Sequence, residues 1–283
     1  MDISYRRALG LAVAAAALVG FGQMTACTTD EDDPGPGTGG RSASYGGAAG
    51  AAGEEGGTVC ANPTVLTSES PGIADFEAYD GSDISTWFFA LGGDSSTDVV
   101  AGPFVYGDEP DGNPETSEMS HDGHDSDFAL RIADTLAEEY GGGMGLWISS
   151  CLDASAFTGI SFWVRGNAPT GTAVITLLME ESTSSTPETA DSQIGTCPGT
   201  DAEENCIHPS FTFDVPEDGS WAQVEVQWNR FQGGLAVDAA VPVDGHNIWQ
   251  IQFDIGLEWV EGDPDYVPVA APYELVVDDL TFY

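Results

Sequence analysis

The side chains of this sequence best suited to ligand chemistry are aromatic rings, amides and carboxylates. Exposed Trp and Tyr rings can stack on the apolar C–H faces of sugar rings, while amides and carboxylates take up hydroxyl groups. Trp163 and Arg165 are the leading pair, because alternation along their segment turns both side chains outward. The aromatic candidates for stacking are Trp87, Tyr106, Tyr140, Trp147, Trp163 and Trp259.

Alternation assigns further polar side chains to outward faces. Phe162, Val226 and Phe253 belong to apolar sets that point into a core, so the residues between them point out. The predicted ligand-binding residues are Trp163, Arg165, Asp214, Glu225, Gln250, Gln252 and Asp254. They form one surface if their strands are neighbours in a concave sheet; the alternative is an ordinary solvated sheet face. The same parity places Trp221, Trp228 and Trp249 in the core.

Motifs for catalysis are missing from the sequence. There is no Gly-x-Ser-x-Gly elbow and no His-Glu-x-x-His pair, and no glycine-rich loop precedes a predicted helix. Segment 121–127 holds two His and three Asp, but no predicted helix places both His on one face. A turn with a solvated acidic rim is therefore favoured over a transition-metal site, and we expect no enzyme activity.

The charge balance excludes one class of partner. The chain has 47 acidic residues against six Arg and no Lys, a formal net charge of −41. Such a surface repels phosphate backbones, so nucleic acid is excluded as a partner, while cation binding is favoured.

The N-terminal region predicts export. Arg6 and Arg7 form a positive segment, and the apolar stretch 9–21 is too short and too rich in Ala and Gly for a comfortable membrane span. Residues 24–27, Met-Thr-Ala-Cys, resemble the lipobox of bacterial lipoproteins. We therefore expect residues 1–26 to be a lipoprotein signal peptide and Cys27 to be the lipid anchor.

The segment after the anchor predicts a spacer. Residues 27–58 are rich in Gly, Asp, Pro, Ala and Ser, which is typical of a flexible tether. Thr28 stands where an Asp would hold the protein at the inner membrane, so the expected location is the outer membrane or cell surface.

Four further cysteines suggest two disulfides in an oxidising compartment. Cys197 and Cys206 enclose a short polar loop and are natural partners, so Cys60 and Cys151 pair by elimination.

From about residue 59 to residue 283 the pattern becomes strand-like. About nine runs alternate or are continuously apolar, with Gly, Asp, Asn and Pro between them and no convincing helical periodicity. This predicts an all-β domain, an antiparallel β-sandwich or jelly roll. The predicted strands are 73–77, 128–132, 145–148, 159–165, 173–179, 211–215, 221–228, 248–255 and 273–283.

Four short motifs occur in an order that resembles a known family. They are Ala-Asp-Phe-Glu at 74–77, Phe-Thr-Gly-Ile-Ser-Phe-Trp-Val-Arg-Gly at 157–166, Ser-Trp-Ala-Gln-Val at 220–224 and Val-Val-Asp-Asp-Leu-Thr-Phe at 276–282. The sequence is similar to the galactose-binding-like jelly roll, and within it to calcium-bearing carbohydrate-binding modules of family eleven and relatives in families four and twenty-two. It departs from them in an acidic segment, 94–127, and a Cys-closed insert, 180–209.

The resemblance implies a structural calcium ion. In the family a Glu after the first strand's Phe and an Asp in the closing strand share the ion, which here implies Glu77 and Asp278, with Asp279 as a second choice. Asp278 also shares parity with Val276 and Leu280, so it is expected on the apolar side, where a carboxylate needs a cation or several donors.

These observations together predict an exported, lipid-anchored surface protein that captures a polysaccharide or oligosaccharide without catalysis. The alternative is an envelope adhesion or scaffold domain of the same fold without a sugar site.

Overall fold

The computed structural model describes eleven stretches of the chain. They are residues 60–67, 72–91, 99–107, 113–137, 141–185, 195–198, 206–233, 235–236, 239–240, 243–261 and 266–283. Every described residue belongs to one compact unit, Gly46–Tyr283. The predicted signal peptide, Cys27, the tether and Tyr140 lie outside the described residues.

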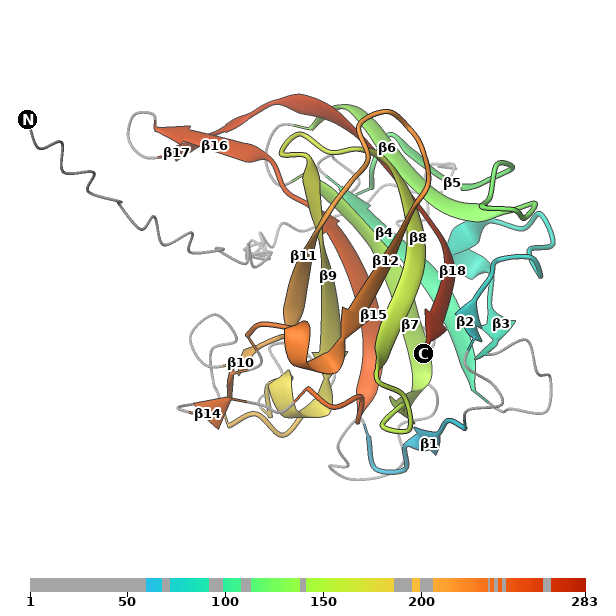
Figure 1. The fold of residues 1–283 in the computed structure, drawn as a ribbon, viewed down its shortest axis with the longest axis vertical. Helices are drawn as coiled ribbons and strands as arrows, with labels where there is room; N and C mark the ends of the chain where they lie inside the picture. Colours follow the sequence, from blue (N-terminus) through green and yellow to red (C-terminus); the bar gives the residue numbers. More distant parts are fainter. Residues whose placement is uncertain are drawn as a thin grey trace, which may run out of the picture. The chain divides into compact units, whose positions relative to one another are not determined.

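The domain is an all-β sandwich of two antiparallel sheets, as predicted (Figure 1). Sheet A has the order β11-β9-β15-β7-β4-β3, with β1 beside β7. Its strands are β1 (Thr64–Val65), β3 (Phe89–Ala90), β4 (Val100–Gly107), β7 (Gly142–Asp153), β9 (Thr172–Met179), β11 (Ser210–Asp214) and β15 (Ile248–Ile255). The one parallel pairing within these two sheets joins β1 to β7.

Sheet B has the order β12-β8-β18-β6-β5, with β2 beside β18. Its strands are β2 (Gly72–Ala74), β5 (Thr116–Ser120), β6 (Ala129–Ala137), β8 (Gly159–Asn167), β12 (Ala222–Gln227) and β18 (Ala271–Phe282). The C-terminal strand β18 therefore lies at the centre of this sheet, which buries the closing motif of the sequence.

Smaller elements lie outside the two main sheets. They are the short strands β10 (Cys206–Ile207), β13 (Leu235–Ala236) and β14 (Ala239–Ala240), the hairpin strands β16 (Glu258–Glu261) and β17 (Tyr266–Val269), and the 3₁₀ turns η1 (Ile84–Thr86), η3 (Glu180–Ser182) and η4 (Trp228–Arg230). The hairpin extends away from the sandwich in Figure 1. Within the described stretches we find no helix with the length and apolar character needed to span a bilayer.

The core between the sheets confirms the predicted alternation. Phe162 of sheet B packs edge-to-face against Phe213 and Phe253 of sheet A, with ring centroids 5.1 and 4.9 Å apart. Among the residues next to these rings, Thr212 and Asp214 are exposed and Trp163, Gln252 and Asp254 are partly exposed, as period-two geometry predicts. The two inner faces thus interlock as in other aligned sandwiches.

The number of strands exceeds the prediction, since the two main sheets contain seven and six strands. The main strands missing from the prediction are β4 and β5. Both lie in the acidic segment 94–127, which was interpreted as an insertion. Gly102 and Pro103 interrupt the apolar pattern of β4, and both residues weaken a strand assignment. They are accommodated because β4 lies near the edge of sheet A, where β3 pairs with only two of its residues.

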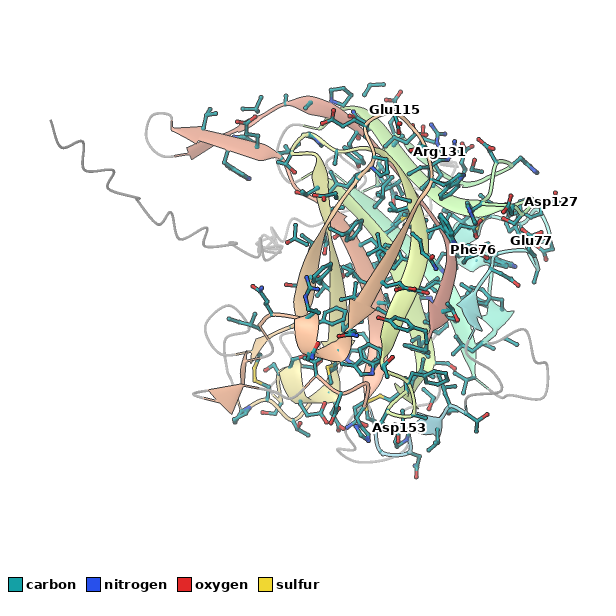
Figure 2. All side chains as sticks on the ribbon, viewed as in Figure 1. Phe76, Glu77, Glu115, Asp127, Arg131 and Asp153 are labelled. Atoms are coloured by element: carbon teal, nitrogen blue, oxygen red, sulfur yellow. A yellow bond between two sulfur atoms is a disulfide. The ribbon has the colours of Figure 1, made fainter. Side chains whose placement is uncertain are left out.

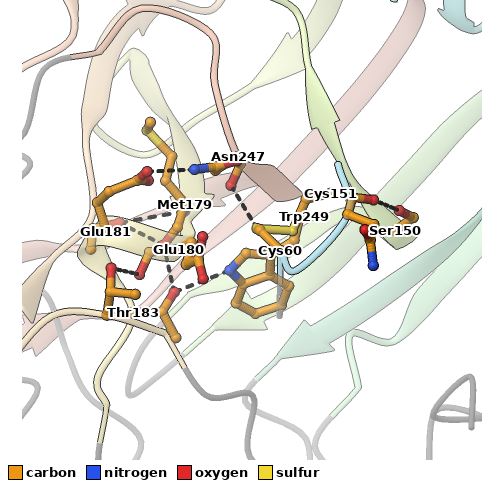
Figure 3. Close-up of a disulfide and its surroundings, with 12 residues drawn as sticks. Cys60, Ser150, Cys151, Met179, Glu180, Glu181, Thr183, Asn247 and Trp249 are labelled. Atoms are coloured by element: carbon orange, nitrogen blue, oxygen red, sulfur yellow. Dashed lines mark hydrogen bonds between the residues drawn. A yellow bond between two sulfur atoms is a disulfide. The ribbon is translucent and has the colours of Figure 1, made fainter. Parts of the chain in front are cut away.

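Both predicted disulfides are confirmed. Cys60 is bonded to Cys151 of β7, with their Cα atoms 5.1 Å apart, and Cys197 to Cys206, with 5.9 Å. Figure 3 shows the first bond next to the turn η3, where Trp249 Nε1 donates to Thr183 Oγ1 at 3.0 Å. The bond fixes the segment before β1 to the strand beside which β1 lies.

Candidate functional site

The seven predicted ligand-binding residues do not form one surface. Trp163, Arg165 and Glu225 lie on β8 and β12, so they belong to the outer face of sheet B. Asp214, on β11, and the three predicted residues of β15 belong to sheet A. The condition for one surface, that all these strands are neighbours in one sheet, is therefore not met, because alternation shows which way a side chain points but not which strands become neighbours.

Strand register on sheet A brings outward side chains into three rows that cross the sheet. Residues directly opposite each other in antiparallel strands project from the same face. From β4 to β11, the rows are Tyr106-Gly143-Asp254-Val174-Thr212 and Phe104-Gly145-Gln252-Thr176-Ser210, and a shorter row from β4 to β9 is Gly102-Trp147-Gln250-Leu178. Aromatic residues thus lie at one end of the first two rows and polar residues in the middle.

Two glycines of β7 allow the rings of Phe104 and Tyr106 to lie across the sheet. A Cβ built on Gly143 would fall 2.1 Å from the Tyr106 hydroxyl, and one on Gly145 would fall 2.7 Å from Phe104 Cζ. An outward Cβ stands above its strand, so these contacts place the outer ends of both rings over the glycines. The ring planes are 14° apart with centroids separated by 6.5 Å. We call Phe104 and Tyr106 the aromatic platform; both side chains are partly exposed.

A ladder of polar side chains borders the aromatic platform on β15. Gln250 Nε2 donates to Gln252 Oε1 at 3.1 Å, and Gln252 Nε2 donates to Asp254 Oδ1 at 2.7 Å and to the Tyr106 hydroxyl at 2.8 Å. The Tyr106 hydroxyl donates to Asp254 Oδ1, and Thr176 Oγ1 donates to Asp254 Oδ2 at 3.2 Å. We call Gln250, Gln252 and Asp254 the polar ladder.

The protonation of Asp254 is shifted by its surroundings. Its carboxyl group lies among the side chains of Tyr106, Gln252 and Thr176, and this burial raises the pKa to about 7. Asp254 is the one acidic residue in the three rows, and no row contains Arg, Lys or His. On a chain with a net charge of −41, this part of the surface is therefore close to neutral.

A second aromatic group extends the face. Trp147, opposite Gly102, packs edge-to-face with Phe88 at a centroid distance of 5.2 Å. Phe88 is exposed and Trp147 partly exposed. Tyr106 and Trp147 were predicted from the sequence as stacking candidates, whereas Phe104, Thr176 and the glycines were not. The signal available was Gly143 and Gly145 at alternate positions of a strand, a pattern that marks close approach of another group.

The outer face of sheet B carries a different arrangement. Trp163 points outward as predicted, but the ring of His124 stacks on it with centroids 3.5 Å apart and planes 13° apart. Arg165 also points outward; its guanidinium lies 5.0 Å from the ring centre of Trp221 and pairs with Asp122 at 2.8 Å. One face of the Trp163 ring is thus taken up by His124 of loop 121–128, although Trp163 stays partly exposed, and the neighbouring cation Arg165 is already paired.

The remaining predicted positions lie apart from the aromatic platform. Glu225, on the edge strand β12, is exposed on the outer face of sheet B. Asp214 is exposed at the end of β11, opposite Thr172, beyond the rows that contain the polar ladder.

The proposed calcium ligands Glu77 and Asp278 both contact loop 121–128. Glu77 Oε1 accepts from the backbone N–H groups of Asp127 and Phe128 at 3.0 and 2.8 Å (Figure 2). Asp278 Oδ2 accepts from the His124 backbone N–H and from Ser126 Oγ, each at 2.7 Å. The two carboxylates therefore hold the loop in place from different points.

Asp278 is buried, but on the opposite side from that predicted. Leu275, Val277 and Leu280 belong to the core, whereas Asp278 lies opposite Trp163 on the outer face. A bulge reverses the parity, since the register shifts after Asp278 and Asp279 has a φ of +49°. The loop above it buries Asp278 completely, and burial raises the pKa of its carboxyl group to about 6.

The carboxylates are surrounded by hydrogen-bond donors, whereas a calcium ion between them would need further oxygen ligands. Asp278 Oδ1 also accepts from the Asp279 backbone N–H at 2.7 Å, so both of its oxygens face protein donors. The Asp279 side chain lies 3.4 Å from His124 Nδ1. Within the described stretches, no group of three or more His, Cys, Asp or Glu is placed to hold a metal ion. Calcium at Glu77, Asp278 and Asp279 stays a prediction.

Other aromatic candidates divide between core and surface. Trp87 is 5% exposed and packs against Tyr79 and Phe89, so it is a core residue. Trp228 is buried as predicted, whereas Trp221 and Trp249 are partly exposed. Trp259, on the hairpin strand β16, is 48% exposed.

Comparisons with known proteins give only distant structural similarity. No family model and no curated protein sequence matches the chain. A family 11 carbohydrate-binding module from Clostridium thermocellum, solved in complex with a β-1,3-1,4-mixed-linked tetrasaccharide, is 13% identical over 75% of this chain and 94% of its own, with a TM-score of 0.36. A family 30 carbohydrate-binding module is 11% identical over 65% and 90%, with a TM-score of 0.37.

A third similar structure is of another kind. The K3 cleaved adhesin domain of Lys-gingipain from Porphyromonas gingivalis is 15% identical over 64% of this chain and 90% of its own, with a TM-score of 0.30. At these identities and TM-scores, the similarity assigns no ligand to this chain.

Proposed function

We propose that the chain is a non-catalytic glycan-binding protein and that its site is the outer face of sheet A. The observation that carries this proposal is the aromatic platform, two partly exposed and nearly parallel rings that reach over glycines and are bordered by the polar ladder. Exposed aromatic rings offer a stacking surface for the C–H face of a pyranose, and amide groups can both donate to and accept from hydroxyls.

The charge of the face supports an uncharged ligand. The three rows contain no cation to pair with a uronate or a sulfate, and the surrounding chain is strongly acidic. An anionic glycan would meet repulsion without a compensating ion pair, whereas a neutral one replaces water at hydroxyl contacts. We expect dissociation constants between about micromolar and millimolar, as for sites with few desolvated contacts.

Calorimetric titration of the full-length chain with neutral oligosaccharides of glucose, galactose, mannose and xylose, and with polygalacturonate, tests the proposal. At least one neutral oligosaccharide should bind. Tyr106→Ala and Phe104→Ala should each weaken binding about tenfold, because each removes one stacking ring.

Trp163→Ala is the matched control, since it removes an outward aromatic ring from the other sheet. It should bind as the wild type does. If Trp163→Ala lost glycan binding while Tyr106→Ala kept it, the binding site would lie on sheet B instead. Failure of every sugar to bind would favour the adhesion or scaffold alternative.

We further propose that the protein is anchored to the cell surface through a lipid on Cys27. The lipobox-like residues and the tether that follows them support this proposal. Cys27→Ser should shift the protein from the membrane fraction to the soluble fraction. A variant that stays in the membrane fraction with normal processing would contradict lipid anchoring.

A further inference from the structure

The carboxyl group of Asp254 is the one ionisable acid within the proposed glycan site, and it controls the hydrogen-bonding state of its neighbours. As an ionised acceptor it takes hydrogen bonds from the Tyr106 hydroxyl, Gln252 Nε2 and Thr176 Oγ1. Three donors of the face are thereby directed inward, at the carboxylate, instead of towards a ligand.

Protonation changes this arrangement in a defined way. A neutral carboxyl group carries one O–H donor and keeps one good acceptor oxygen, so it can no longer accept from all three neighbours. The new O–H can donate to the Tyr106 oxygen, which leaves the Tyr106 proton free to donate to a ligand hydroxyl. One proton is taken up by the carboxylate, and no other covalent bond is made or broken.

Desolvation acts in the same direction. A glycan stacked on the aromatic platform would exclude water from Asp254, which adjoins the Tyr106 hydroxyl. Covering an ionised carboxylate without a cation costs much more free energy than covering a neutral carboxylic acid. Ligand binding and protonation of Asp254 therefore favour each other.

We infer that the outer face of sheet A binds its glycan in a proton-dependent manner, with Asp254 in its neutral form as the binding-competent state. This inference rests on the proposed glycan-binding function and adds its regulation. The raised pKa of the Asp254 carboxyl, about 7, places the transition near neutrality.

The groups that face Asp254 from the neighbouring strands include no second carboxylate and no His, Arg or Lys. They are Tyr106 on β4, Gly143 on β7, Val174 and Thr176 on β9, and Gln252 on β15. Asp214 lies on the same face but is exposed at the end of β11, and none of the residues facing Asp254 is His, Arg or Lys.

The test is calorimetric titration of the full-length chain between pH 5 and pH 9 with the neutral oligosaccharide that binds most strongly in the panel above. By linkage, wild-type affinity should fall about tenfold for each unit by which the bound sugar raises the Asp254 pKa, with the fall centred near neutrality. Asp254→Asn should bind with little dependence on pH. Asp214→Asn, the matched control on the same face, should keep the wild-type dependence.

A second measurement guards against misfolding of the Asp254 variant. The ¹³C chemical shift of the wild-type Asp254 carboxyl group should titrate near neutrality, and its midpoint should rise when the sugar is added. Binding that is independent of pH, or an unmoved midpoint, would overturn the inference and leave the proposed function standing. Absence of binding at every pH would overturn both.

Discussion

The two outer faces of the sandwich are built from the same alternating pattern yet present different surfaces. On sheet A, the aromatic platform and polar ladder are partly exposed and contain no ion pair between their members. On sheet B, Arg131 bridges Glu118 and Glu274, Arg165 pairs with Asp122, and His124 stacks on Trp163, which is also partly exposed. Two of the three Arg of the described domain are thus used for internal pairing on one face.

The difference shows what alternation leaves undetermined. Trp163 and Tyr106 both point away from the core, but only Trp163 lies under a loop. Loop 121–128 is held there by Glu77 and Asp278, which come from opposite ends of the domain sequence. Whether an outward ring is available to a ligand is therefore decided by distant residues and not by its own strand.

Asp278→Ala should have the largest effect on stability and should separate the two faces. It leaves the backbone N–H groups of His124 and Asp279 and the Ser126 hydroxyl without their acceptor, so we expect the free energy of unfolding to fall by about 3 kcal/mol. Denaturant unfolding measures this loss. Glycan binding on sheet A should persist, and its loss in a folded variant would show that the faces are coupled.

The effect of Asp278 should also depend on pH. Burial raises its folded-state pKa to about 6, above the ordinary unfolded value, so its contribution to stability is fully present below about pH 4 and declines as the pH rises to 6. The stability gap between the wild type and Asp278→Asn should therefore narrow over this range. A gap that widens with pH would contradict the raised pKa.

Gly143→Ala should damage sheet A by displacing the aromatic platform. Its Cβ would lie 2.1 Å from the Tyr106 hydroxyl and 2.2 Å from Cζ, so the ring must move. We expect about tenfold weaker glycan binding and a stability loss of about 1 kcal/mol. Gly256→Ala is the control, because its Cβ would meet nothing within 4 Å. Equal binding by both variants would argue against the aromatic platform.

Trp163→Ala should leave glycan binding unchanged and should affect sheet B alone. It removes the stacking partner of His124, for which we expect a stability loss of about 1–2 kcal/mol without loss of the fold. Thermal unfolding measures the stability loss, and the near-ultraviolet circular dichroism spectrum shows whether the fold is kept. Global unfolding of the variant would show that the indole supports the core.

Chelation should have the smallest effect of the series. Because Glu77 and Asp278 already accept hydrogen bonds from protein donors, we expect a chelator to shift the melting temperature by less than about 2 °C. A large fall that added Ca²⁺ reverses would instead support the structural ion that the family resemblance implies.

Much of the fold could be predicted from the sequence, because period-two alternation reports directly on which residues face a core. Phe162, Val226 and Phe253 are all buried as predicted, and the four cysteines after residue 59 led to the pairing that the structure shows. The strand β4 escaped detection, since Gly102 and Pro103 break its pattern although its register with β7 is regular.

The candidate site was harder to predict, for two physical reasons. Strand order depends on long-range pairing, so Gln252 and Trp163 could not be assigned to opposite sheets from local pattern. A single bulge also reverses which face of the sheet a residue points to. The bulge at Asp279, whose backbone is in the left-handed region that Asp tolerates, turns Asp278 to the outer face. Two adjacent Asp residues within an apolar strand were the available sign of that bulge.

The Cys60–Cys151 bond has a mechanical consequence. A pull applied to the chain ahead of residue 60 can pass through the sulfur bridge into β7 without first separating β1 from that strand. β7 is also the strand whose glycines lie beneath the aromatic platform. If residues 27–58 act as a tether and sheet A captures a polymer, as proposed, the load between them would follow a short covalent route through one interior strand. Reduction of the bridge would lengthen that route to include β1, whose two residues would peel away first.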